Sequence, residues 1–119
     1  MRPDRLLLQD ILEAIDEVME TTPRNRAGFD ADKLVRSHII RNIQIIGEGV
    51  WRLSKETKER HPEVPWKIIA AMRHAIVHDY FEVDFNEVYN TARRDVPPLR
   101  PLIAAILNAL PPDPDGDAI

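Results

Sequence analysis

The chain is organised around nine residues, Met72-Arg73-His74-Ala75-Ile76-Val77-His78-Asp79-Tyr80. Three of their side chains offer polar chemistry. Arg73 is a permanent cation whose planar guanidinium group suits a phosphate. His78 can exchange a proton near neutral pH, and Tyr80 adds a hydroxyl group. This stretch is therefore the first candidate for a functional site.

A helical geometry makes Arg73 unusual. At about 100° per residue, one face of the helix carries the apolar side chains around the motif: Ile69, Met72, Ile76 and Tyr80. Arg73 falls within that stripe, where a charge is costly unless another group pairs with it or the stripe borders a cleft. For Arg73 and His78 to share one site, the helix must end or distort near His78, or a second chain must complete the site. From the spacing alone, a structural arginine in an ion pair and a surface histidine remain the simpler interpretation.

The spacing Arg73-x4-His78-x-Tyr80 resembles the Arg-x4-His-x-Tyr signature of the HepT-like toxins in the HEPN superfamily. The resemblance extends over roughly residues 5 to 108. It includes Arg41-Asn42-Ile43 with Ile46-Gly47-Glu48, then Pro62-Glu63-Val64-Pro65-Trp66 before the motif and Tyr80-Phe81-x-Val83-Asp84 at its end. His74 is a departure, because the family commonly has Asn directly after the motif arginine.

The resemblance implies the toxin of a toxin–antitoxin system, acting as a metal-independent endoribonuclease on tRNA with no cofactor. Cleaving RNA without a metal requires a base for the 2′-hydroxyl, an acid for the leaving oxygen and a cation for the phosphorane charge. One chain supplies half of such a symmetric set, so the family implies a homodimer with a composite cleft. Arg73 would then hold the phosphate and His78 would be the acid and base. The residues expected to support them are His74, Asp79, Arg41 and Glu48.

The resemblance also implies a partner protein and a modification. HepT-like toxins are neutralised by a cognate minimal nucleotidyltransferase, the antitoxin, which transfers AMP onto the motif tyrosine, here Tyr80. An AMP group beside Arg73 would add bulk and negative charge to the cleft. Without the resemblance, a buried aromatic ring with a hydrogen-bonded hydroxyl is the preferred interpretation of Tyr80.

A second function stays open, from a different class: a non-catalytic helical module that binds a minimal nucleotidyltransferase and nucleotide. The two hypotheses differ on whether His78 performs chemistry. We expect no metal site, because the i, i+4 pair His74 and His78 has no Glu between its members and no obvious third ligand. Gly47-x-Gly49 lies within a helical pattern and is not a phosphate-binding loop.

Composition limits the class of protein. A chain of 119 residues fits one domain. The absence of cysteine excludes disulfides and thiol catalysis and suits the reducing cytoplasm, where we place the protein. We see no signal peptide and no apolar run near the roughly 18 residues of a membrane span. Because the net charge is −4, RNA must meet a local basic patch drawn from Arg36, Arg41, Arg52, Arg73, Arg93 and Arg94. An acidic chain also suits a partner with a basic surface.

The hydrophobic periodicity predicts an all-α, up-and-down bundle of four to five helices. We expect a HEPN-like helical domain over residues 1–110 and a disordered Pro- and Asp-rich tail over residues 111–119. The expected helices span about 4–20, 31–60, 65 to 77 or 80, 85–94 and 98–110, with a loop over 21–29.

The long second helix is apolar on two sides and therefore needs two partners: one is its own core, and a second copy of the chain is a candidate for the other. Gly47 and Gly49 each weaken a helix by about 1 kcal/mol, which predicts close approach of another backbone. Packing within one chain is equally compatible with these two glycines.

Overall fold

The computed structural model describes residues 3–75 and 83–111. Every element in these residues is a helix, which confirms the all-α prediction. The elements are α1 (Asp4–Thr21), α2 (Arg26–Ala31), α3 (Lys33–Arg52), α4 (Lys55–Arg60), α5 (Trp66–Ala75), α6 (Phe85–Asn90), the π-helix η1 (Thr91–Asp95) and α7 (Leu99–Ala109).

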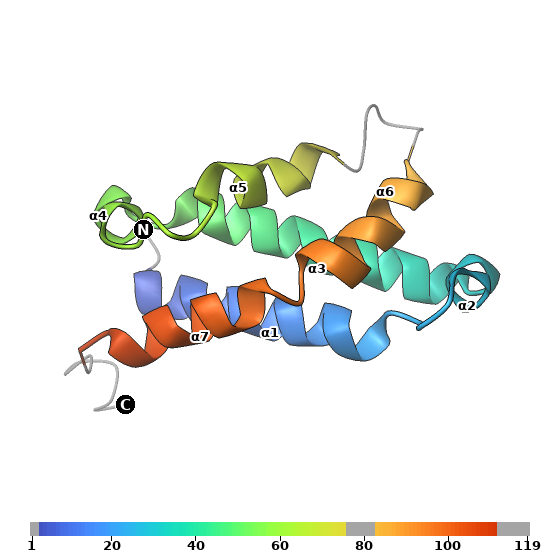
Figure 1. Ribbon diagram of the computed structural model, residues 1–119, viewed down its shortest axis with the longest axis horizontal. Coiled ribbons are helices and arrows are strands. Elements are labelled where there is room, and N and C mark those ends of the chain that lie inside the picture. The colour runs from blue at the N-terminus through green and yellow to red at the C-terminus, as the bar shows by residue number, and fades with distance from the viewer. Residues whose placement is uncertain (1–2, 76–82, 112–119) are drawn as a thin grey trace.

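The body of the molecule, which measures 46 × 25 × 24 Å, is built from helices that run lengthwise (Figure 1), namely α1, α3, α5 and α7. The chain direction alternates from α1 to α3, α5 and α7. Helix α1 packs against α3 and α7, and α3 also packs against α5. Short helices close the ends, with α2 and α6 at one end and α4 at the other. Helix α3 thus lies between α1 and α5, the arrangement on which the candidate site depends.

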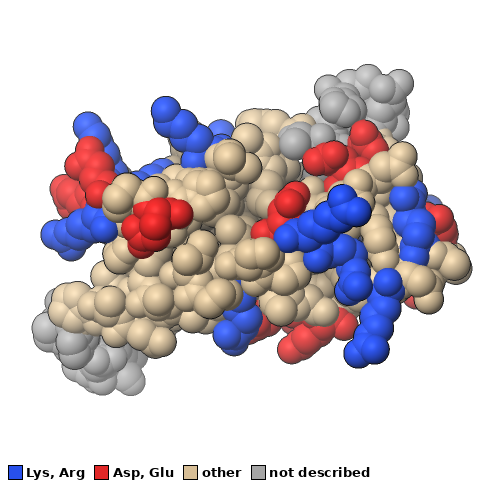
Figure 2. All heavy atoms as spheres, viewed as in Figure 1, with Lys and Arg blue, Asp and Glu red and all other residues tan. Residues whose placement is uncertain are grey.

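The core is aliphatic, as the low aromatic content of the sequence requires. Helix α3 contributes a buried stripe at helical spacing: Ile39, Ile43, Ile46 and Val50, each with 0% exposure. The surface over α7 is largely uncharged in Figure 2, while Lys, Arg, Asp and Glu side chains lie interspersed over both ends of the molecule. In the described residues, no helix has both the length and the apolar character needed to cross a bilayer.

The predicted single helix over residues 31–60 is wrong, because the chain forms α3 and α4 there, and α2 lies mostly within the expected loop over 21–29. Side-chain caps start the new helices. Asp32 accepts a hydrogen bond from the Val35 amide at 3.1 Å, and Ser54 accepts one from the Thr57 amide at 3.2 Å. These bonds satisfy amides that have no partner within the helix, so each cap stabilises the first turn of its helix.

A half-buried carboxylate, that of Asp4 at the start of α1, stabilises the second break, between α3 and α4. Asp4 accepts hydrogen bonds from the Ser54 amide at 3.0 Å and from the hydroxyls of Ser54 and Thr57. Burial raises the pKa of the Asp4 carboxyl, but these hydrogen bonds outweigh burial, and the pKa lies below its usual value. The start of α1 therefore holds the turn between α3 and α4.

The predicted helix over residues 85–94 also needs correction. It is α-helical only to Asn90 and continues as a π-helix, in which the Val96 amide donates to the Thr91 carbonyl at 2.9 Å, five residues away. The side chain of Asp84 caps α6, accepting from the Glu87 amide at 3.1 Å. Helix α7 agrees with its prediction to within a residue at each end.

The two glycines of α3 are close to other parts of the same chain. A Cβ atom on Gly47 would lie 2.9 Å from the Arg73 nitrogen and 3.3 Å from the Ala70 carbonyl oxygen, both in the α5 backbone. A Cβ atom on Gly49 would lie 2.6 Å from the Ile11 side chain on α1. Close approach of another backbone is confirmed for Gly47, within one chain.

The second apolar side of α3 remains open in the single chain. Leu34 is 81% exposed and Trp51 is 57% exposed, while Ile40 and Ile45 are half-buried. The expected tail lies outside the described residues from position 112 onward.

Candidate active site

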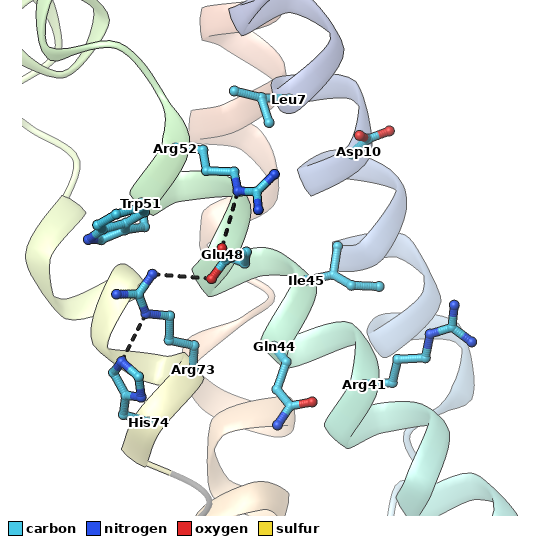
Figure 3. A pocket seen from close by; sticks show the side chains of 11 residues that line it. Leu7, Asp10, Arg41, Gln44, Ile45, Glu48, Trp51, Arg52, Arg73 and His74 are labelled. Carbon is cyan, nitrogen blue, oxygen red and sulfur yellow. Dashed lines mark hydrogen bonds and ion pairs between the residues drawn. The ribbon is translucent and has the colours of Figure 1, made fainter. Parts of the chain in front are cut away.

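An open pocket of about 780 Å³ lies over α3, with α1 on one side and α5 on the other (Figure 3). Its lining comes from three helices: Leu7 and Asp10 from α1, Arg41, Gln44, Ile45, Glu48, Gly49, Trp51 and Arg52 from α3, and Arg73 and His74 from α5. The pocket therefore contains the motif arginine and three of the residues predicted to support it.

Arg73 is the most constrained charge in this pocket. Its Nη1 atom donates to the Glu48 carboxylate at 3.2 Å, and its Nε atom donates to His74 Nε2 at 3.0 Å. Its guanidinium carbon lies 4.6 Å from the centre of the Trp51 ring, over the ring. Only 20% of the side chain is exposed. The charge in the apolar stripe thus has an ion-pair partner and borders a cleft, the two conditions expected from the sequence.

Glu48 joins two arginines across two helices. Besides Arg73, it accepts a hydrogen bond from Arg52 Nε at 3.1 Å. Arg41 lines the same pocket, so the pocket holds three arginines against two carboxylates, Asp10 and Glu48. The side-chain charges of the pocket therefore sum to a positive value, although the whole chain has a net charge of −4. The Glu48–Arg52 pair is half exposed, so it is weak and can rearrange around a bound anion.

His74 lies where the family pattern commonly has Asn. Its Nε2 atom accepts the hydrogen bond from Arg73, which places the proton of a neutral ring on Nδ1. An Asn side chain also carries an acceptor, its amide oxygen. The departure therefore keeps an acceptor next to the motif arginine.

Asn42 and Ile43, the neighbours of Arg41 in the family-like segment, have structural roles. Asn42 Nδ2 donates to the His38 carbonyl at 2.9 Å and is 6% exposed, while Ile43 is in the core. His38 Nε2 lies 2.9 Å from a Glu17 carboxylate oxygen, joining α3 to α1. Among Arg41, Asn42 and Ile43, Arg41 is the residue that lines the pocket.

Contacts from α4 support the Trp51 side of the pocket. Lys58 Nζ donates to the Trp51 carbonyl at 3.2 Å, and Trp66 Nε1 donates to the carbonyls of Lys58 and His61 at 3.1 and 2.9 Å. Burial lowers the pKa of the Lys58 ammonium, while the nearby Asp4 carboxylate partly opposes that shift. These contacts hold the C-terminal end of α3 to α4 and to the turn between α4 and α5.

Sequence reasoning named Arg52 as a candidate for a basic patch but did not foresee the Trp51–Arg73 contact. The available signal was a large aromatic residue one turn after Glu48 on the open side of the helix. His78, Asp79 and Tyr80 lie outside the described residues, so their roles stay predictions. Within residues 3–75 and 83–111, no cluster of three or more His, Asp or Glu side chains is arranged to hold a metal ion.

The structure defines an all-α protein with a locally basic pocket around an anchored arginine, and comparison with known proteins identifies the family. The family model for HepT-like ribonucleases, described as "Ribonuclease HepT-like", matches residues 11–106. The chain belongs to this HepT-like family of the HEPN superfamily. The matched region contains every pocket residue from α3 and α5.

Several relatives have names that mention ribonuclease. The chain is 37% identical over 94 residues to "Probable ribonuclease HepT" of Thermococcus cleftensis, covering 78% of this chain and 86% of that protein. It is 32% identical over 100 residues to a "Putative RNase" of Methanocaldococcus jannaschii, covering 83% of each. It is 33% identical over 108 residues to a "Putative RNase" of Caldanaerobacter subterraneus, covering 90% of this chain and 96% of that protein. No solved structure matches the chain.

Proposed function

We propose that the chain is a metal-independent endoribonuclease that acts as the toxin of a toxin–antitoxin pair. The observation that carries the proposal is the anchored Arg73 at the wall of an open, locally basic pocket. Membership of the HepT-like family supports RNA as the ligand of that pocket, because relatives carry ribonuclease names.

The proposed reaction is an internal attack within RNA. A base removes the proton from the 2′-hydroxyl, and the 2′-oxygen forms a bond to the adjacent phosphorus. The bond from phosphorus to the 5′-oxygen of the next nucleotide breaks, and an acid gives that oxygen a proton. The products are a 2′,3′-cyclic phosphate and a 5′-hydroxyl. We assign proton transfer to His78 and stabilisation of the phosphorane charge to Arg73.

Two copies of the chain would complete this site. The reaction needs an acid and a base at once, and one chain supplies a single motif histidine. A two-fold dimer would bring two copies of Arg73 and His78 to one cleft. The open apolar side of α3, with Leu34 81% exposed, is compatible with burial against a second copy. His74, Glu48, Arg41 and Asp79 would support the paired motifs.

The cognate partner in this proposal is a minimal nucleotidyltransferase antitoxin. It would transfer AMP onto the hydroxyl of Tyr80, and the added phosphate would compete with RNA for Arg73. The proposed substrate is tRNA, and the proposed compartment is the cytoplasm. The family resemblance supports these assignments.

The test is cleavage of a total tRNA pool in EDTA by the wild type and by Arg73→Ala and His78→Ala. We expect products from the wild type and none from either variant, with 2′,3′-cyclic phosphate ends. Arg24→Ala and His61→Ala are matched controls, since Arg24 is exposed and the His61 side chain contacts Glu63, away from the pocket. Products with 3′-hydroxyl ends would contradict the proposed chemistry.

If the wild type does not cleave the tRNA pool either, the result would favour the second function, a non-catalytic module that binds the nucleotidyltransferase and nucleotide. That conclusion requires mass spectrometry to show that Tyr80 carries no AMP. Binding of a purified nucleotidyltransferase without any cleavage would then replace the enzymatic proposal.

A further inference from the structure

We infer that Trp51 is a stacking platform for an unpaired RNA base, next to the phosphate that Arg73 holds. The inference rests on the proposed function and extends it, because it makes single-stranded RNA the substrate class. Trp51 is 57% exposed, although it is one of the largest apolar side chains and it lies on a helix with a well-buried opposite face. A large aromatic ring beside a cationic pocket is what single-stranded nucleic-acid sites use.

The geometry leaves part of the indole available for a ligand. The guanidinium carbon of Arg73 lies 4.6 Å from the ring centre and covers one face of the ring. Since more than half of the residue is exposed, the ring retains surface on which a flat base can stack. Figure 3 shows the ring beside Arg73 at the edge of the pocket. A phosphate bound to Arg73 and a base on Trp51 can therefore belong to one strand.

The ring is also held in place before any ligand binds. The carbonyl of Trp51 accepts a hydrogen bond from Lys58 at 3.2 Å, which ties the last turn of α3 to α4. The contact with Arg73 restrains the indole from the other side, and Glu48 restrains Arg73 in turn. A platform that is already ordered loses less conformational entropy when a base stacks on it.

The charges around the ring favour a nucleic-acid strand over an uncharged aromatic ligand. Arg41, Arg52 and Arg73 line the pocket that the ring borders, against Asp10 and Glu48. In a duplex the bases are stacked on one another and are not available to a flat platform. The arrangement thus selects unpaired segments, such as loops, with little preference for sequence, because every base has a π-face.

Two tryptophans in the chain make the inference measurable by fluorescence. Trp66→Phe leaves Trp51 as the single emitter, and Trp51→Phe leaves Trp66, which is half-buried and hydrogen-bonded to the α4 corner. The probe is a fluorescein-labelled 2′-O-methyl RNA decamer of mixed sequence, which cannot be cleaved because its 2′-oxygens are blocked. We expect the single-stranded probe to quench Trp51 emission and to leave Trp66 emission unchanged.

Affinity gives a second readout that does not depend on Trp66→Phe folding well. By fluorescence anisotropy, Trp51→Ala should bind the single-stranded decamer roughly 5- to 100-fold more weakly than the wild type. Trp51→Phe should stay within about threefold of the wild type, since a phenyl ring can still stack. Ile68→Ala is the matched control, because Ile68 is 71% exposed on α5 but does not line the pocket. The same decamer annealed to its complement should bind at least about tenfold more weakly than the single strand.

The inference is overturned if Trp51 emission does not change at saturation, if Trp51→Ala binds like the wild type, or if the duplex binds equally well. Failure of the wild type to bind any probe overturns it too. If a second copy of the chain covers Trp51 instead, dilution without RNA will change the emission of Trp51 and the molecular mass of the protein in solution, and adding RNA will change neither.

Cleavage assays separate this inference from the proposed function. If Trp51→Ala cleaves RNA with unchanged KM and kcat, the proposed ribonuclease function stands and the stacking role of Trp51 is refuted. If Trp51→Ala raises KM at similar kcat, both proposals are supported.

Discussion

Gly47→Ala tests whether the contact between α3 and α5 sets the position of Arg73. The new Cβ atom would lie 2.9 Å from the Arg73 nitrogen and 3.0 Å from its Cβ atom. Ordinary carbon contacts are about 3.5–4.0 Å, so α5 must retreat by about 0.5–1 Å. Alanine favours the helix by about 1 kcal/mol, while overpacking costs about 1–3 kcal/mol. The expected net cost is about 0–2 kcal/mol, or a Tm lower by up to about 8 °C.

The effect on activity should exceed the effect on stability. A displacement of about 1 Å at a catalytic group can lower a rate by about 100-fold. We therefore expect RNA cleavage by Gly47→Ala to fall by about 10- to 100-fold at a temperature where the protein is fully folded. Ile15→Val, in the core of α1, is the stability-matched control, with a cost of about 0.5–1.5 kcal/mol. Wild-type rates in Gly47→Ala, or an equal loss in Ile15→Val, would refute the reasoning.

Three further predictions concern charges and assembly. Glu48→Gln removes a negative charge beside Arg73 that repels RNA phosphates. The KM for RNA should therefore fall by about two- to fivefold at low salt and by less at high salt. A higher KM would show that the carboxylate aids binding. Asp4→Asn should lower the free energy of unfolding by about 1 kcal/mol at pH 7. The folded-state pKa of Asp4 is lowered, so its carboxylate stabilises the protein above the usual value of 3.8, and this advantage is lost as the pH falls through the folded-state pKa. Urea unfolding of both proteins at pH 7 and pH 3 should thus show a smaller difference at pH 3, and an unchanged difference would contradict this. Finally, a mixed dimer of one wild-type chain and one His78→Ala chain retains a single His78, so it should be about as inactive as the His78→Ala homodimer, because the reaction needs an acid and a base at once; half of the wild-type activity in a verified mixed dimer would argue against a shared cleft.

The helix class and the unusual arginine were accessible from the sequence. Aliphatic periodicity predicts the lengthwise helices, since each must bury one face. The position of Arg73 within an apolar stripe predicts a partner or a cleft, and the structure shows both in Glu48 and the pocket. Gly47 predicts a close backbone, and α5 is that backbone.

The helix boundary at Ser54 is predicted wrongly because a local cap interrupts a run of helix-forming residues. Asp32 caps α3 close to the expected start of the long helix, whereas Ser54 precedes Lys55–Arg60, which are mostly strong helix formers and carry no obvious stop signal. The break at Ser54 also depends on Asp4, which is 50 residues away in the chain. The π-helical continuation after Asn90 carried no composition signal that we can identify.

The aromatic part of the site could not be foreseen for a related reason. Trp51 and Arg73 are on different helices, and their contact depends on how the turn after α4 directs α5 against α3. A helical wheel of either segment shows on which face of the helix a residue lies, but not which residue of another helix it contacts. Exposure of Trp51 becomes informative only when the packing of α3 between α1 and α5 is known.

The most direct test of the central claim is single-turnover cleavage of one defined single-stranded RNA in EDTA by wild type, Arg73→Ala and Arg24→Ala. If Arg73 stabilises the phosphorane charge, Arg73→Ala should be slower by about 100- to 1,000-fold. Arg24→Ala should match the wild type, because Arg24 is exposed and does not line the pocket. An Arg73→Ala protein that cleaves as fast as the wild type would show that this pocket is not the site of catalysis.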